Sequence, residues 1–298
     1  MNNHSLKLNL NAVDLYPEIM NIYGDRGNIL YFRYRASLYG INVNIKSATV
    51  GEKIDINKTD IMFIGGGQDS EQALIYKDLT VNKKNELKDA KDAGKIMLSI
   101  CGGYQLLLDY YKAADNKIIE GISIFNGYTI AEPKKPRLTG NIASIFGDIT
   151  IVGFENHGGR TYLSESQQGF GKVLAGYGNN GTDKSEGAIA NNFYGTYIHG
   201  SILPKNFIFC DMLINIAVKN KYKIRLDEIA AKNNINIDNN FEINARKDIK
   251  DLQKIRTKRF TGLAMLRLNW EVPSLSSGKV SLLQYSIPFQ PNPFLWHH

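Results

Sequence analysis

The sequence predicts an α/β fold, a three-layer sandwich built around a mostly parallel β-sheet. Short apolar or alternating segments, typical of strands, are separated by longer segments with helical spacing. Two of the strands end in clusters of small residues, at 65–67 and 99–103. Functional sites in such sheets lie at the carboxyl ends of the strands, so we expect both clusters to lie in one site.

The first half of the chain alternates strands and helices. Helical spacing is found at 29–38 and over the polar stretch 70–93. Strands that alternate with helices favour a parallel sheet with both faces covered. The segments with strand character are 5–10, 41–45, 60–64 and 95–100.

The second half is richer in strand and turn signals. Strands are expected at 148–154 and 193–198, and a closing helix at 211–221. The last part of the chain is different: it contains both tryptophans and four of the eight prolines, but few charges. We therefore divide the chain into an α/β domain, a basic segment and a tail that is rich in proline and aromatic residues, for which the sequence assigns no role. Their boundaries are 1–240, 241–260 and 261–298.

The net charge of +7 is unevenly distributed. Residues 241–298 hold nine Lys or Arg and four Asp or Glu, so residues 1–240 keep a net charge of only +2. A basic footprint for a nucleic-acid backbone is missing from the α/β domain, and we expect no nucleic-acid partner. The basic run 246–259 is interpreted as a solvated helix face rather than a site for an anionic surface.

Composition also limits the compartment and the chemistry. No stretch approaches the roughly 18 apolar residues of a membrane span, and the N-terminus lacks the apolar core of a signal peptide. We expect a cytoplasmic protein without a transmembrane segment. Two cysteines cannot form a disulfide framework, and Cys210, in an apolar run, is expected to be buried and structural. No Cys-x-x-Cys or His-x-x-x-His spacing occurs, so no metal site is expected.

Cys101 is the strongest candidate for a chemical role. It follows the expected strand 95–100 in a turn of small residues and precedes a stretch, 104–111, that we expect to be helical. A nucleophile at a strand–turn–helix corner is exposed to substrate. The unpaired N–H groups at the start of the helix favour a thiolate and an oxyanion.

A catalytic thiol also needs a base and donors for an oxyanion. His199 follows the expected strand 193–198 and should share the carboxyl edge of the sheet, so it is the best candidate for the base. His157 is its competitor, with a structural or substrate-side role as the alternative. Backbone N–H groups next to glycine can approach a ligand closely. The expected oxyanion donors are Gly66, Gly67 and Gly102.

The corner resembles the Gly-x-Cys-x-Gly-x-Gln signature of class I glutamine amidotransferases, which have a flavodoxin-like fold. Cys101, Gly103 and Gln105 match, and Ser99 replaces the first glycine. This resemblance implies that Cys101 is the nucleophile of a glutaminase.

The base region departs from the common pattern of that family. The usual His-x-Glu reads His199-Gly200-Ser201 here, so the glutamate of the triad is missing. That absence is a feature of the cobyric-acid-synthase-like branch, and it implies a dyad of Cys101 and His199. Several further stretches resemble glutaminase subunits of this branch that serve peptidoglycan synthesis. They lie at 23–28, 65–72, 100–105, 137–140, 153–162, 176–180 and 195–200.

The resemblance implies a substrate, L-glutamine, and a partner. Arg137 matches the family's substrate-binding arginine and would grip the α-carboxylate as a planar donor. Gln105 would either help to hold the substrate or cap the helix after Cys101. Ammonia would pass to an ATP-dependent, Mur-ligase-like synthetase in a heterodimer, which amidates the D-glutamate of lipid II. ATP and Mg²⁺ are expected on the partner, and no cofactor on this chain.

Two other hypotheses stay open at this point. An amidotransferase of this kind could feed a different synthetase, as in amidation of a corrinoid. The fold could also be a binding module without catalytic activity. Variants of the proposed nucleophile and base distinguish a binding module from both kinds of amidotransferase.

Overall fold

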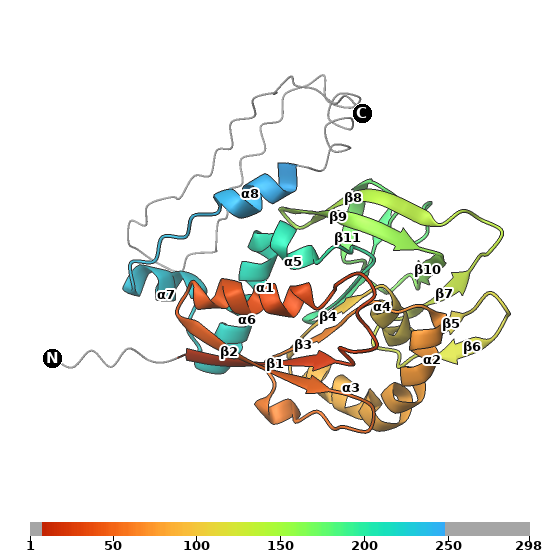
Figure 1. Cartoon of the computed structure of the whole chain (residues 1–298), viewed down its shortest axis with the longest axis horizontal. Coiled ribbons are helices and arrows are strands. Elements are labelled where there is room, and N and C mark those ends of the chain that lie inside the picture. Colours follow the sequence, from red (N-terminus) through yellow and green to blue (C-terminus); the bar gives the residue numbers. More distant parts are fainter. Residues whose placement is uncertain (1–7, 248–298) are drawn as a thin grey trace, which may run out of the picture. The chain divides into compact units, whose positions relative to one another are not determined.

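The computed structural model describes residues 8–247 (Figure 1). The tail 261–298 lies outside the described residues, as does most of the basic segment 241–260. The described part of that segment belongs to helix α8 (Asn240–Lys247). The division of the chain near residue 240 stays a prediction.

A six-stranded sheet forms the centre of the domain, in the order β13-β14-β4-β3-β1-β2. Its neighbours pair in parallel except for the antiparallel pair β13 and β14. The mostly parallel sheet expected from the sequence is therefore confirmed. Its strands are β1 (Leu8–Leu15), β2 (Ile41–Ala48), β3 (Ile61–Ile64), β4 (Ile96–Ile100), β13 (Ala188–Ala190) and β14 (Phe193–Thr196).

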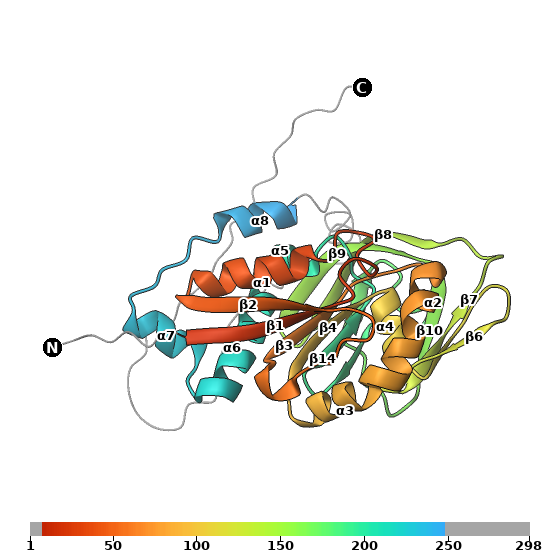
Figure 2. The ribbon, with the colours of Figure 1, turned by 60° about the horizontal axis from the view of Figure 1, so that its bottom comes forward.

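Helices cover both faces of this sheet, which confirms the three layers. Figure 2 shows α1 (Gly27–Ser37) on one side of the strands and α3 (Lys84–Asp92) on the other. Helix α6 (Phe207–Tyr222) contacts α1 and begins four residues before the expected closing helix. The expected helix at 70–93 is divided into α2 (Asp69–Asp78), a π-helical turn η2 (Leu79–Lys83) and α3.

Residues 110–186 add two four-stranded sheets beside the central one, drawn in yellow and green in Figure 1. One has the order β10-β7-β5-β6 and the other β12-β11-β8-β9. The strand expected at 148–154 is confirmed and extends further, to His157. The strands of these two sheets are β5 (Tyr110–Lys112), β6 (Ile118–Glu120), β7 (Gly127–Ala131), β8 (Leu138–Phe146), β9 (Ile149–His157), β10 (Gly159–Leu163), β11 (Gly171–Ala175) and β12 (Ser185–Glu186).

The helix expected at 104–111 is wrong in its second half. Helix α4 (Gly102–Leu107) is short, and the chain enters β5 at Tyr110. The ring of Tyr110 stacks on Tyr128 of β7, with centroids 5.2 Å apart. Aromatic pairs across strands stabilise a sheet, and here that pairing outweighs the local helical spacing.

The parallel order brings four loops to one edge of the central sheet. The loops that follow β1, β3, β4 and β14 all leave from the carboxyl ends of neighbouring strands. Cys101 follows β4, the triple glycine follows β3, and His199 comes three residues after β14. Among residues 8–247, no helix combines the length and the apolar character that crossing a bilayer requires.

Candidate active site

Cys101 occupies a strained corner between β4 and α4. Its backbone has φ +49° and ψ −106°, a conformation that side-chain-bearing residues rarely adopt. Two hydrogen bonds hold the corner: the N–H of Cys101 donates to the Thr196 carbonyl at 2.8 Å, and the Gln105 N–H donates to the Cys101 carbonyl at 2.9 Å. The side chain is buried but not sealed, with 8% exposure. This geometry matches the strand–turn–helix corner that the sequence predicts.

The triple-glycine loop lies directly against this corner. A Cβ on Gly66 would lie 3.4 Å from the Cβ of Cys101 and 3.2 Å from the Cε1 of His199. A Cβ on Gly102 would collide with the Gly67 carbonyl and lie 2.8 Å from the Gly67 nitrogen. Gly102 therefore needs to be glycine, because the two backbones approach more closely than a side chain allows, whereas a Cβ on Gly66 would press on the side chains of the site.

A backbone hydrogen bond holds His199 in place. Its N–H donates to the Phe154 carbonyl at 2.6 Å, in an isolated bridge between this loop and β9. The imidazole is 1% exposed. Burial opposes its protonation, but the thiolate of Cys101 and the carboxylate of Asp25 outweigh burial and raise the pKa of His199 to about 10. The structure thus brings the predicted nucleophile and the predicted base together.

Asp25 is a buried residue of the site that sequence reasoning missed. Its Oδ1 lies 3.5 Å from the Nδ1 of His199, and its Oδ2 accepts the Gly66 N–H at 2.8 Å. The only signal in the sequence is its place in the motif 23–28, which marks the stretch but not the carboxylate. The expectation for Gly66 has to be revised, because its N–H is already bound to Asp25.

Gln105 has both ends of its side chain occupied inside the protein. Its Oε1 accepts from the Nε2 of Gln72 at 2.9 Å, and its Nε2 donates to the Tyr197 hydroxyl at 3.0 Å. Gln72 also donates to the Gly67 carbonyl at 3.3 Å. This network ties helix α4 to the triple-glycine loop, where α4 is the helix of the strand–turn–helix elbow at Cys101. It favours a positioning role for Gln105 over contact with substrate.

His157 is built into the neighbouring sheet. Its ring stacks on Tyr197 with centroids 3.6 Å apart, and its Nδ1 is 2.8 Å from the Gly159 carbonyl. Burial lowers its pKa, so the neutral ring is favoured. Of the two alternatives in the sequence, the structural role fits these contacts.

The chain matches the family of CobB/CobQ-like glutamine amidotransferase domains over residues 12–207. That span includes the elbow, the triple-glycine loop and the candidate base. The chain belongs to this family. It is a glutamine-hydrolysing amidotransferase with an α/β fold.

Individual members of the family are similar to this chain. The amidotransferase is 47% identical over 205 residues to the GatD subunit of a lipid II isoglutaminyl synthase (glutamine-hydrolyzing) from Staphylococcus aureus, covering 68% of this chain and 82% of that protein. It is 41% identical over 215 residues to the subunit of the same name from Streptococcus pneumoniae, covering 72% and 82%. A cobyric acid synthase from Listeria innocua is 33% identical over 175 residues, which is 57% of this chain and 34% of that protein.

Arg137 of the amidotransferase immediately precedes β8. Its Nε donates to the Asn156 side chain and its Nη2 to the Asn156 carbonyl, both at 2.9 Å. The residue is exposed, and Arg160 holds the preceding turn through the Pro136 carbonyl. No contact of Arg137 with Cys101 or His199 is present within residues 8–247, so its role in binding substrate stays a prediction.

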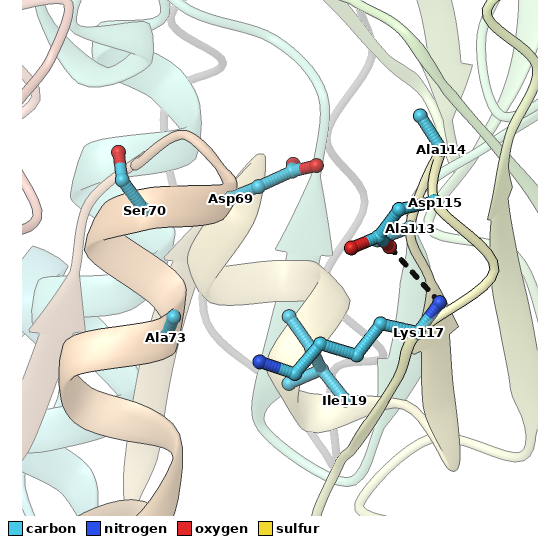
Figure 3. Close-up of a pocket in the computed structure, with 8 residues that line it drawn as sticks. All are labelled: Asp69, Ser70, Ala73, Ala113, Ala114, Asp115, Lys117 and Ile119. Carbon is cyan, nitrogen blue, oxygen red and sulfur yellow. Dashed lines mark hydrogen bonds between the residues drawn. The ribbon is translucent and has the colours of Figure 1, made fainter.

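A hollow of about 370 Å³ lies between the start of α2 and the β5–β6 hairpin (Figure 3). Asp69 and Asp115 point toward each other across it, and Lys117 extends from the hairpin toward α2. Asp69 also accepts a hydrogen bond from Tyr111 at 2.9 Å. Burial raises the pKa of Tyr111 and Asp69 reinforces the effect, with a smaller contribution from Cys101. Neither Cys101 nor His199 is among the residues that line this hollow.

Proposed function

We propose that this amidotransferase is the glutaminase subunit of a lipid II isoglutaminyl synthase. The observation that carries the activity is the placement of a buried imidazole beside the cysteine at the elbow. The pathway is supported by the two relatives that bear this name, whose similarity extends over more than 200 residues.

In the first half-reaction, the thiolate of Cys101 attacks the side-chain amide carbon of glutamine. The carbonyl oxygen becomes an oxyanion, for which we assign the backbone N–H groups of Gly67 and Gly102. The imidazolium of His199 gives its proton to the departing nitrogen, the C–N bond breaks, and ammonia leaves behind a glutamyl thioester.

In the second half-reaction, His199 acts as a base. The thioester carries no charge on sulfur, so the largest influence that raises the pKa of His199 is gone. The imidazole can then take a proton from water, and the resulting hydroxide attacks the thioester carbon. The C–S bond breaks, glutamate leaves, and the Cys101 thiolate forms again beside a protonated His199.

We assign the α-carboxylate of glutamine to Arg137. A guanidinium matches a carboxylate as a planar, two-pronged donor. Its bonds to Asn156 hold the guanidinium in a fixed orientation at the edge of β8. Gln105 supports the elbow in this proposal and does not touch the substrate.

We further propose that the ammonia is used by a Mur-ligase-like synthetase subunit in a heterodimer. That partner would bind ATP and Mg²⁺ and activate the D-glutamate carboxyl of lipid II as an acyl phosphate. Ammonia would then displace the phosphate to form D-isoglutamine. This division leaves the present chain with glutamine hydrolysis and the partner with lipid II.

The test uses the complex of this chain with its synthetase partner. Cys101→Ala should abolish release of glutamate from glutamine and glutamine-dependent amidation of lipid II, while amidation driven by ammonium chloride should persist. Cys210→Ala is the matched control, because Cys210 is fully buried in α6 and should leave both activities intact. Glutaminase activity that survives in Cys101→Ala would exclude the proposed mechanism.

A second candidate, amidation of a corrinoid, is favoured by the similarity to cobyric acid synthases, at 33% identity in the example above. The two candidates differ in the acceptor and share the glutaminase. Presenting the complex with lipid II and with a corrinoid acid in parallel decides between them. Amidation of the corrinoid alone would overturn the peptidoglycan assignment.

A further inference from the structure

Ser201 occupies the position where related enzymes carry the glutamate of a triad, and it makes a different contact. Its hydroxyl donates to the Gly24 carbonyl at 2.9 Å. This contact fastens the segment after His199 to the loop that follows β1, across a sequence separation of 177 residues. Ser201 therefore anchors a neighbouring loop and leaves the imidazole to another partner.

The loop after β1 is joined to the segment of the base at further points. The side chain of Asn28 accepts the Leu203 N–H at 3.0 Å. The ring of Tyr23 packs edge-on against His199, with centroids 4.4 Å apart. These contacts on either side of residue 25 hold its carboxylate beside the imidazole.

Asp25 and His199 present complementary buried atoms to each other. The Oδ1 of Asp25 and the Nδ1 of His199 are 3.5 Å apart, and neither makes another hydrogen bond within the described chain. Leaving such atoms unpaired is costly in a buried site. Catalytic hydrogen bonds are often long without substrate and tighten in the reacting complex. The geometry identifies each atom as the partner of the other.

We propose that Asp25 is the positioning residue that completes a triad with Cys101 and His199, supplied from the loop after β1 instead of the usual position after the histidine. The inference rests on the proposed glutaminase mechanism. Through Oδ1 the carboxylate fixes the ring orientation and keeps Nδ1 protonated, so that Nε2 faces the sulfur. Through Oδ2 it holds the Gly66 N–H, so one side chain aligns the base and the oxyanion loop.

The groups that face His199 come from several elements. Cys101 lies at the elbow, Asp25 and Tyr23 belong to the loop after β1, and His157 lies on β9. Of these, Cys101 and Asp25 raise the pKa of His199. Removal of the Asp25 charge should therefore let His199 lose its proton at lower pH.

Steady-state kinetics of Asp25→Asn in the synthetase complex test this prediction. We expect kcat for glutamine hydrolysis to fall about 10- to 100-fold. This loss is smaller than the loss on replacing the aspartate of a Ser-His-Asp triad, because His199 already holds the proton in the resting enzyme. KM should stay within about twofold, since Asp25 acts through His199. The alkaline limb of the kcat/KM profile should move to lower pH. Asp14→Asn is the matched control, a buried carboxylate near the end of β1 that forms an ion pair with Arg26.

Alkylation of Cys101 by iodoacetamide separates this inference from the proposed function, since it needs no turnover. Cys210 is fully buried and its pKa is raised by burial, so the label reports Cys101. In the native protein the rate should change near pH 10, where His199 loses its proton. In Asp25→Asn that inflection should fall by about one pH unit or more.

The outcomes are distinct. A native protein without glutaminase activity but with the expected shift in alkylation would reject the proposed function and keep the triad. An unchanged inflection in Asp25→Asn would overturn the triad, whatever happens to kcat. If the variant does not fold, NMR titration of His199 in the native protein decides, because an imidazole pKa near the ordinary 6.5 would also overturn it.

Discussion

At the scale of single residues, the site is assembled from loops that lie far apart in the sequence. Cys101 and His199 could be predicted because each follows a strand that ends at the same edge. Asp25 could not, because its partners Gly66 and His199 are 41 and 174 positions away along the chain. A carboxylate in a glycine-containing turn has an ordinary local explanation.

The contact between the elbow and the oxyanion loop leads to a prediction for Gly102→Ala. The new Cβ would collide with the Gly67 carbonyl and lie 2.8 Å from its nitrogen, so the two loops must separate. We expect a loss of about 100-fold or more in kcat for glutamine hydrolysis, as for removal of an oxyanion donor. Gly169→Ala is the control, since its Cβ would have only ordinary contacts from 3.6 Å outward. Full activity of Gly102→Ala would remove the oxyanion assignment.

At the scale of elements, parallel strands and long helices could be predicted, whereas short strands and the π-helical turn could not. Strands β5, β6 and β13 have three residues each, too few to show a period. The turn η2 brings Lys83 against Asp78, five residues earlier, and Lys83 also donates to the Thr49 carbonyl at 3.0 Å. An i, i+5 contact is invisible to a pattern based on an ordinary helix.

This ion pair leads to a prediction for stability. Lys83 is fully buried, and Asp78 also accepts a hydrogen bond from Tyr16, the residue just after β1, at 2.8 Å. Lys83→Met leaves a buried carboxylate without its cation, so the free energy of unfolding should fall by about 3 kcal/mol. Urea titration measures this change, with the exposed Lys77→Met as control. Equal stability of both variants would show that the pair contributes nothing.

At the scale of the whole molecule, the described residues contain every group that we assign to catalysis. Helix α8 packs against the rest of the described chain. Its Glu242 accepts a hydrogen bond from Tyr31 at 2.8 Å and lies 3.7 Å from the buried Arg35. Asn239, just before the helix, accepts from Arg35 at 2.7 Å. Residues 239–242 are therefore packed against the α/β domain, whereas most of the basic run 246–259, predicted to be a solvated helix face, lies outside the described residues.

Two truncations test this boundary. A chain that ends at residue 247 should keep the kcat/KM of the full chain for glutamine, because the site lies within 8–247. A chain that ends at residue 238 loses the Arg35 partners Asn239 and Glu242, so its melting temperature should drop, as measured by differential scanning fluorimetry. Loss of glutaminase activity in the chain that ends at residue 247 would show that the residues after 247 contribute to the site.

The strand order also has a consequence for synthesis on the ribosome. Cys101, the proposed nucleophile, directly follows β4, and the neighbouring strand β14 is the last parallel strand to be made. Until residues 193–196 have emerged, the nascent chain has an open edge beside β4 and no base next to its thiol. Pairing over such a separation forms late in folding. With the roles assigned to Cys101 and His199, the site is therefore complete only after β14 has paired with β4.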